Sequence, residues 1–519
     1  MIPVVDLFAG PGGLGEGFSA YSKASKQSVY NIVLSVEKQQ DAHRTLELRS
    51  FFRKFSREDV PDEYYQYLRG DIGRKKLFDL YPNHATLAKN EALCMELGKD
   101  RKSNDIIDSR ITELLKDCPD NKWVLIGGPP CQAYSVVGRA RNKGKKDYSL
   151  EQDPKSYLYK EYLRIIAKYS PAIFVMENVK GMLSSKINGG SLFEKVISDL
   201  KCPQKTVFGT SKNNFKSDDE YDIYSLVTPE TSPEGLKNKS KLFIVKSEKY
   251  GIPQTRHRVI VFGVRKDFSY VSPRSLYEKD EVVVRDVLDG LPAIRSGLSR
   301  EKDSLTSWRQ RLFETLECEW FNEGITQKLD EKVLDHIMSA LSEIETVELD
   351  RGHEFVCHDM KVRQDLAWWF LDDRLGGACN HMSKSHMVTD IHRYLFAASF
   401  AEYYGHSPKI MEFPKELIPN HKNAKSGHFD DRFRVQIADK PSSTITSHIS
   451  KDGHYFIHYD PEQCRSLTVR EVARLQTFPD NYFFEGNRTQ QYIQVGNAVP
   501  PLLARQIASI TYDLLSCIS

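Results

Sequence analysis

A glycine-rich turn near the start of the chain constrains the fold most strongly. The apolar segment Val4–Phe8 is typical of a short strand, and Ala9–Phe18 follows it with five glycines on the way into a helix. Glycine tolerates positive φ and lets the backbone approach a ligand closely. A second apolar segment, Ile32–Val36, ends in Glu37, and an acidic residue at this place commonly binds ribose hydroxyls. These features predict a nucleotide-binding unit within an α/β fold.

A third polar site is predicted at Gly70–Ile72. If this tripeptide ends a third strand, Asp71 is placed to accept a hydrogen bond from an adenine amino group. An ordinary turn aspartate is an equally good interpretation of the same residues.

Two further apolar segments place reactive side chains at the same edge of the predicted sheet. Trp123–Ile126 predicts an interior strand that leads into Cys131, and Ala172–Met176 predicts another that leads directly into Glu177. Ligand crevices in open α/β sheets lie beyond the carboxyl ends of strands, so both side chains should face one crevice. A lone cysteine is more often a small buried residue, and a lone glutamate a solvated one. The functional interpretation therefore depends on the two occurring together.

Arginines precede the next apolar segment, Val259–Val264. If that strand begins early, its period of two places Gln254, Arg256 and Arg258 on one face. Two arginines aligned in this way predict a clamp for an anion or a carbonyl group.

Helix signals mark the end of the chain. Thr468 and Glu471 have the spacing of a capping box, and Pro500–Pro501 suits the first turn of another helix. The turn before these prolines, Gly496–Val499, is either part of a functional site or a plain structural cap, and the sequence favours neither interpretation.

Composition sets the wider frame. Lys and Arg number 73 against 71 Asp and Glu, so any basic surface for nucleic acid must be local. Ser135–Lys146 carries five positive charges, and we expect a mobile loop that contacts phosphates, with a solvated face as the alternative. Scattered cysteines without a C-x-x-C pair suit a reducing compartment, and neither a signal peptide nor a long apolar run is present. We expect a cytoplasmic protein of several domains without a membrane segment.

Six blocks, taken together, resemble the DNA cytosine-5 methyltransferases of prokaryotic type. They are Asp6–Gly13, Gly128–Gln132, Glu177–Val179, Gln254–Arg258, Arg465–Glu471 and Gly496–Val499. The resemblance implies a Rossmann-like methyltransferase sheet with helices on both faces and a separate, mixed target-recognition domain. It also implies a catalytic domain at residues 1–288, target recognition at 289–443, and completion of the catalytic domain at 444–519.

The resemblance implies a role for each catalytic residue. The thiolate of Cys131 would attack C6 of a cytosine flipped out of double-stranded DNA. Glu177 would contact N3 and the exocyclic amine, Arg258 would hold O2, and Arg256 would shape the pocket. C5 would then take the methyl group of S-adenosyl-L-methionine before Cys131 is eliminated.

Further sites follow from the same resemblance. The residues implied to bind the methyl donor are Phe8, Gly10, Gly12, Gly13, Leu14, Glu37, Asp71, Ile72, Pro130, Asn497 and Val499. The residues expected to contact DNA are Gln132, Ser135, Arg139, Arg141, Lys143 and Lys145.

Two other functions stay open, together with the question of a metal. A tRNA-modifying cytosine-5 methyltransferase shares the catalytic blocks but generally has a shorter middle region, and a silent DNA-binding relative would be expected to lack Cys131 or Glu177.

His353, Cys357, Cys379 and His381 are candidate zinc ligands, but their spacing fits no standard zinc module, so we expect no metal. We expect a monomer that acts in restriction-modification or phage defence, with a cognate restriction or defence system as the expected partner besides DNA.

Overall fold

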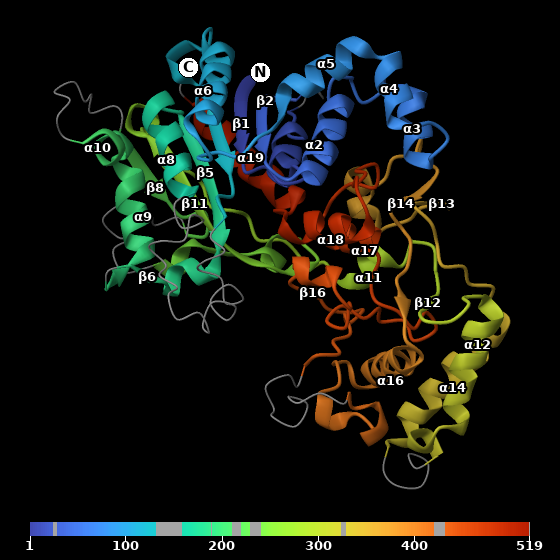
Figure 1. The fold of residues 1–519 in the computed structure, drawn as a ribbon. Helices are drawn as coiled ribbons and strands as arrows, with labels where there is room; N and C mark the ends of the chain where they lie inside the picture. Colours follow the sequence, from blue (N-terminus) through green and yellow to red (C-terminus); the bar gives the residue numbers. More distant parts are fainter. Residues whose placement is uncertain are drawn as a thin grey trace. The chain divides into compact units, whose positions relative to one another are not determined.

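The computed structural model describes residues 1–23, 28–130, 158–187, 189–209, 220–228, 240–322, 329–419 and 431–517. The chain forms two compact units (Figure 1). The first comprises Met1–Val60, Phe78–Asp280 and Ala498–Ser519, and the second comprises Pro61–Leu77 and Glu281–Asn497. The break after Asp280 lies close to the predicted boundary at 288. Most of the predicted C-terminal catalytic segment, 444–497, belongs instead to the second unit.

An eight-stranded sheet forms the centre of the first unit. Its order is β3-β2-β1-β4-β5-β11-β8, and β9 also pairs with β11. The five strands from β3 to β5 are parallel, whereas β11 runs antiparallel to its neighbours. The chain winds outward in opposite directions from β1 and β4, and ligands of open α/β sheets bind at such a reversal. The strands are β1 (Ile2–Leu7), β2 (Tyr30–Glu37), β3 (Ala92–Cys94), β4 (Val124–Gly127), β5 (Ile173–Val179), β8 (Tyr221–Tyr224), β9 (Ile244–Lys246) and β11 (His257–Arg265).

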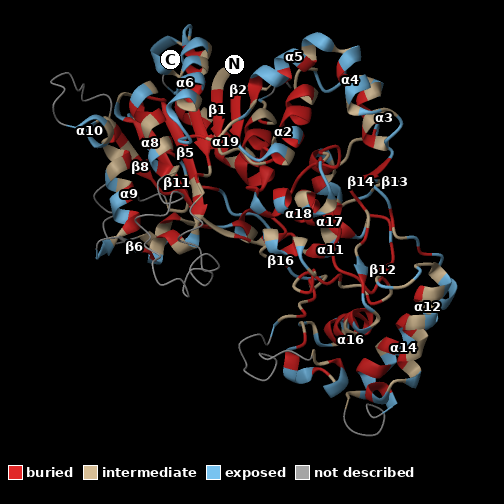
Figure 2. Cartoon of the chain, viewed as in Figure 1, coloured by how far each residue is buried: buried red, intermediate tan, exposed pale blue. Residues whose placement is uncertain are grey.

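Helices cover both faces of this sheet. Val5 and Leu7 of β1 join the apolar core formed with α6, α8 and α9, whereas Asp6 between them points toward α1. On that second face α19 packs closely on α1, because a Cβ atom at Gly17 would lie 2.4 Å from Ala504 Cβ. Figure 2 shows the strands buried along most of their length, with exposed residues on the outer sides of the helices. The predicted α/β fold with helices on both faces is confirmed.

The first unit also contains the helices that cover the sheet and several short strands. Its helices are α1 (Gly13–Ser19), α2 (Gln40–Phe52), α5 (Pro82–Glu91), α6 (Arg101–Leu115), α8 (Leu158–Tyr169), α9 (Leu192–Lys201), α10 (Pro203–Phe208) and α19 (Pro501–Ser516). Its short strands are β6 (Lys186–Ile187), β7 (Gly190–Ser191) and β10 (Gln254–Thr255).

The second unit has an apolar core of its own, built mainly on helices α12, α14 and α16. This core also takes in Ile457 and Cys464, which lie beyond the predicted end of the target-recognition domain at 443. Its helices are α3 (Asp62–Arg69), α11 (Val284–Leu288), α12 (Leu305–Phe313), α14 (Glu331–Thr346), α15 (Ala367–Phe370), α16 (Val388–Tyr404), α17 (Val469–Leu475) and α18 (Arg488–Asn497), and α4 (Arg74–Leu80) spans a boundary between the units. Its short strands are β12 (Gly297–Leu298), β13 (Phe355–Cys357), β14 (Gly377–Cys379), β15 (Ser385–His386) and β16 (Ser442–Ser443).

Local sequence signals located most of these elements. The capping box is confirmed, since the Thr468 side chain accepts from the Glu471 N–H and Glu471 accepts from the Thr468 N–H. α19 begins at Pro501, as expected for a proline in the first turn. Within the part of the chain that the structure describes, no helix is long and apolar enough to cross a membrane.

Two strand predictions are wrong. Gly70–Ile72 does not end a strand: Gly70 closes α3 in the left-handed conformation with φ of 87°, and the third strand of the sheet is β3. Gln254–Arg258 is not the early part of one continuous strand either. The Arg256 N–H donates to the carbonyl of Gln254, two residues back, and this tight turn separates β10 from β11.

Candidate active site

The glycine-rich turn lies between β1 and α1 in the first unit. Gly10 and Gly12 have φ of 56° and 101°, in the left-handed region that favours glycine. Gly13 is required for another reason, because a Cβ atom there would lie 2.2 Å from the carbonyl oxygen of Val499. Val499, the last residue of the final predicted block, therefore packs directly on the turn predicted to bind the methyl donor.

Glu37, the last residue of β2, fixes this turn. Its Oε2 accepts a hydrogen bond from the Gly10 N–H at 2.9 Å, and its Oε1 accepts one from the Gln39 N–H at 2.7 Å. Burial raises the pKa of Glu37, and these backbone N–H groups partly offset that effect. The predicted neighbourhood of Glu37 and the glycine turn is thus present in the fold.

A hollow of about 380 Å³ lies beside Glu37. It is lined by Lys38, Gln39, Cys94, Met95, Glu96, Lys99 and Ser103, which come from the ends of β2 and β3 and from the start of α6. The Met95 N–H donates to the carbonyl of Glu37, and Lys38 forms an ion pair with Glu96 at 2.9 Å. The sequence prediction missed this wall because β3 is only three residues long.

Asp6 is a buried acid beneath the glycine turn that sequence reasoning placed in a block but gave no role. It is 0% exposed, and burial raises its pKa to about 8. Nearby Arg53 and the Gly15 backbone N–H offset only part of this shift. The strand alternation of β1 could have indicated that Asp6 points away from Val5 and Leu7, toward the helix that the turn begins.

The predicted catalytic carboxylate and one predicted arginine meet at the end of the sheet. Arg258 Nε lies 2.9 Å from Oε1 of Glu177, with the two side chains 15% and 14% exposed. Their strands are neighbours, since β11 pairs antiparallel with β5 and places Arg258 opposite Val179. Glu177 lies inside β5 rather than after it, so its backbone is held by the sheet.

The turn that follows β4 lies against the same carboxylate. A Cβ atom built on Gly128 would lie 3.1 Å from Oε2 of Glu177. The next residue of β5, Asn178, donates from Nδ2 to the carbonyl of Pro129 at 3.3 Å. Two consecutive side chains of β5 therefore contact the segment that leads to Cys131.

Arg256, the other predicted arginine, is buried rather than aligned at the strand surface. It is 1% exposed, and its pKa is lowered well below the usual value by burial and by Arg258, which Glu177 counteracts in part. Its carbonyl accepts from both the N–H and the hydroxyl of Ser247. The role of the Arg256 side chain in shaping the pocket stays a prediction.

Several predicted residues fall outside this geometry. Cys131, Gln132, Ser135, Arg139, Arg141, Lys143 and Lys145 lie outside the described residues, and Pro130 is the last described residue before them. Asp71 and Ile72 belong to the second unit, on the turn after α3, and not to the sheet that carries Glu37. Asn497 ends α18 in that unit, whereas Val499 lies in the first unit with Phe8 and Leu14.

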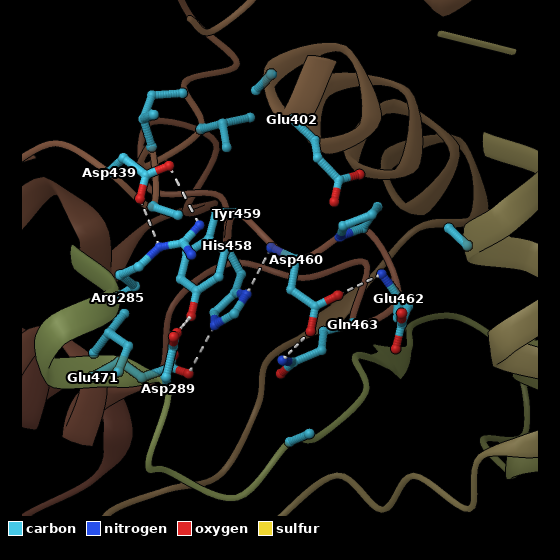
Figure 3. A pocket seen from close by; sticks show the side chains of 18 of the residues that line it. Arg285, Asp289, Glu402, Asp439, His458, Tyr459, Asp460, Glu462, Gln463 and Glu471 are labelled. Carbon is cyan, nitrogen blue, oxygen red and sulfur yellow. Dashed lines mark hydrogen bonds and ion pairs between the residues drawn. The ribbon is translucent and has the colours of Figure 1, made fainter. Parts of the chain in front are cut away.

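The second unit contains a different kind of hollow, of about 610 Å³ (Figure 3). Asp439 pairs with Arg285, and the ring of His336 lies 2.9 Å from Glu402. Burial and neighbouring acids raise the pKa of Glu462 to about 7. None of the predicted catalytic or donor-binding residues lines this hollow, and its acidic walls disfavour phosphate.

The candidate zinc ligands lie in or beside the paired strands β13 and β14 of the second unit. Both ring nitrogens of His381 are hydrogen-bonded, one to Thr468 Oγ1 and one to the carbonyl of Pro292, while His353 is exposed. Among the described residues, no three His, Cys, Asp or Glu side chains are grouped to hold a metal ion.

Comparison with known proteins is consistent across the chain. The model of the C-5 cytosine-specific DNA methylase family matches residues 88–203 and 234–511. The type II methyltransferase M.Bpa9945I of Bacillus paralicheniformis is 33% identical over 99% of both chains. The type II methyltransferase M.AgeI of Thalassovita gelatinovora is 25% identical over 97% of each chain, and the DNA (cytosine-5-)-methyltransferase M.ApeKI of Aeropyrum pernix is 24% identical over 76% of this chain and 82% of its own. A family match over more than half of the chain, joined to this sheet-end geometry, shows that the protein belongs to the C-5 cytosine-specific DNA methylase family.

Proposed function

We propose that this enzyme transfers a methyl group from S-adenosyl-L-methionine to C5 of a cytosine flipped out of a specific double-stranded DNA sequence. Family membership supports the general reaction. The observation that carries the site is the ion pair of Glu177 and Arg258 against the Gly128–Pro130 turn. This turn leads directly to Cys131, the proposed nucleophile.

The chemistry requires three kinds of group at this edge. C5 of cytosine is a poor nucleophile until a thiolate adds to C6 and converts the ring to an enamine, which is the task of Cys131. Glu177 hydrogen-bonds the N3 edge and favours its protonation as charge develops on the ring. Arg258 holds both the carboxylate and the O2 edge, because its guanidinium offers several donors in one plane. After C5 has taken the methyl group, loss of the C5 proton allows the bond between Cys131 and C6 to break and restores the ring.

The residues around Glu37 fit the methyl donor. Bound there, S-adenosyl-L-methionine supplies an electrophilic methyl group. The carboxylate of Glu37 is placed for ribose hydroxyls, and Gly10 and Gly12 bring backbone close to the ligand. The hollow at Cys94–Glu96 occupies the place where the third strand ends, so we assign the adenine edge to this wall in preference to Asp71 and Ile72.

In the proposal the substrate is double-stranded DNA, as family membership favours, and the duplex must open before C6 of the target cytosine becomes accessible. Flipping one base costs a few kcal/mol, which contacts to the phosphates and the vacated helix must offset. In the proposal, those contacts come from four basic residues that lie 8 to 14 positions after Cys131, namely Arg139, Arg141, Lys143 and Lys145. Target reading is assigned to 289–443, and the relatives named type II methyltransferases favour a restriction-modification role.

Transfer of labelled methyl groups from S-adenosyl-L-methionine tests the proposal directly. We expect label on duplex DNA and none on tRNA, with complete loss in Cys131→Ser. DNA that contains 5-fluorocytosine should trap a covalent complex with the wild type, because the fluorine blocks loss of the C5 substituent. Label on tRNA alone would overturn the DNA assignment, and label on neither would indicate a silent binding protein. Sequencing the 5-methylcytosines of an expressing host then identifies the target sequence.

A further inference from the structure

Gly128 is a glycine that the backbone conformation does not demand. Gly10 and Gly12 adopt positive φ, whereas Gly128 does not. Other residue types are therefore compatible with its backbone, and the reason for glycine must lie in the space beside it.

That space is occupied by the proposed catalytic carboxylate. A Cβ atom on Gly128 would lie 3.1 Å from Glu177 Oε2 and 3.9 Å from the Glu177 carbonyl oxygen. A carbon–oxygen approach of 3.1 Å forces the neighbour to move by a few tenths of an ångström. Glu177 cannot yield freely, because its other oxygen is held 2.9 Å from Arg258 Nε and its backbone lies within β5.

We infer that Gly128 is a positioning residue, which leaves the volume that the Glu177 carboxylate needs to engage the cytosine edge. The same strand fixes the turn from the other side, since Asn178 donates to the carbonyl of Pro129. The absence of a side chain at Gly128 and the hydrogen bond from Asn178 to Pro129 together set the distance between this turn and the Glu177 carboxylate. This inference rests on the proposed function, in which Glu177 acts on the base.

The test is Gly128→Ala in the full-length enzyme. We expect kcat to fall about tenfold, because small misplacements of catalytic groups are costly, while the dissociation constants for DNA and for S-adenosyl-L-methionine change by less than about twofold. The rate of covalent trapping on 5-fluorocytosine DNA should fall in parallel. The melting temperature checks that the sheet is intact.

A double substitution separates positioning from a general structural defect. Glu177→Asp withdraws the carboxylate from the added methyl group, so its cost should be smaller in the Gly128→Ala background than in the wild type. An unchanged kcat in Gly128→Ala, or costs that simply multiply in the double variant, would overturn the inference. If the wild type itself labels no DNA, it is the proposed function that fails.

Discussion

In the first unit, burial raises the pKa of two carboxyl groups near the glycine-rich turn, those of Asp6 and Glu37. In the second unit, burial instead lowers the pKa of several histidines. The histidines are His381, His386, His392, His454 and His458. The carboxyl groups lie where a ligand is proposed to bind, and neighbouring groups only partly offset the effect of burial on their pKa. This suits a site in which the bound substrate supplies further interactions. The histidines are hydrogen-bonded within the protein and hold the fold.

The ionic pairs of the two units sharpen this contrast. In the second unit Arg465 bonds Glu471 through two nitrogens, at 2.7 and 2.6 Å, with side chains only 1% and 2% exposed. This pair lowers the pKa of Glu471 well below its usual range. In the first unit Arg110 and Glu113 form a pair whose side chains are 27% and 69% exposed.

The largest effect is expected from Arg465→Ala. Removing the arginine leaves Glu471 buried without its partner, which should lower the free energy of unfolding by about 3–5 kcal/mol. Tryptophan fluorescence during urea unfolding measures this, because Trp308, Trp320, Trp368 and Trp369 all lie in the second unit. The matched change Arg110→Ala should cost less than about 1 kcal/mol. Equal losses in the two variants would remove the contrast.

Acidification should weaken the second unit through its neutral histidines. The pKa of His381 is lowered to about 4 by burial, so its contribution to stability is complete above the unfolded value of about 6.5 and is lost as the pH falls toward 4. Between pH 7.5 and 5 this one residue accounts for about 2 kcal/mol. His381→Gln should flatten the pH dependence of urea unfolding, and an unchanged pH dependence in this variant would contradict the prediction.

Asp6 should show the opposite sign in the first unit. Its folded pKa of about 8 exceeds the unfolded value, so its contribution is present at acid pH and is lost as the pH rises from about 4 toward 8. Asp6→Asn should therefore protect β1 at pH 8 by about 1–2 kcal/mol in the ligand-free protein. Hydrogen exchange of the Ile2–Leu7 peptide, corrected for the intrinsic rate, measures the change. Greater protection of the wild type at pH 8 than at pH 6 would contradict the assignment.

The smallest effect is expected at the rim of the proposed donor pocket. Lys38 and Glu96 form an exposed ion pair, and Lys38→Ala should change the dissociation constant for S-adenosyl-L-methionine by less than about threefold. Glu37→Gln should weaken binding by about tenfold, because it alters the group proposed to hold the ribose. Calorimetric titration compares the two variants. A larger effect of Lys38→Ala than of Glu37→Gln would contradict the assignment of the methyl donor to this hollow.

Local patterns predicted the elements that carry the site but not every assignment. Glu37 at the end of β2 and the capping box of Thr468 follow from short-range rules, and both are present. Gly70–Ile72 misled because a glycine that closes a helix looks the same in sequence as one that closes a strand. The wall at Cys94–Glu96 escaped because three residues are too few for a periodic signal.

The sequence by itself determined the α/β fold, the glycine turn and the order of the blocks, since these depend on neighbours along the chain. Only the tertiary structure decided which side chains meet. Gly128 approaches Glu177, and Val499 closes on Gly13, because β-sheet pairing and helix packing bring together residues far apart in sequence. The same packing sets the desolvation that moves the pKa of Asp6 and His381 in opposite directions, and no local pattern encodes how completely a side chain is removed from water.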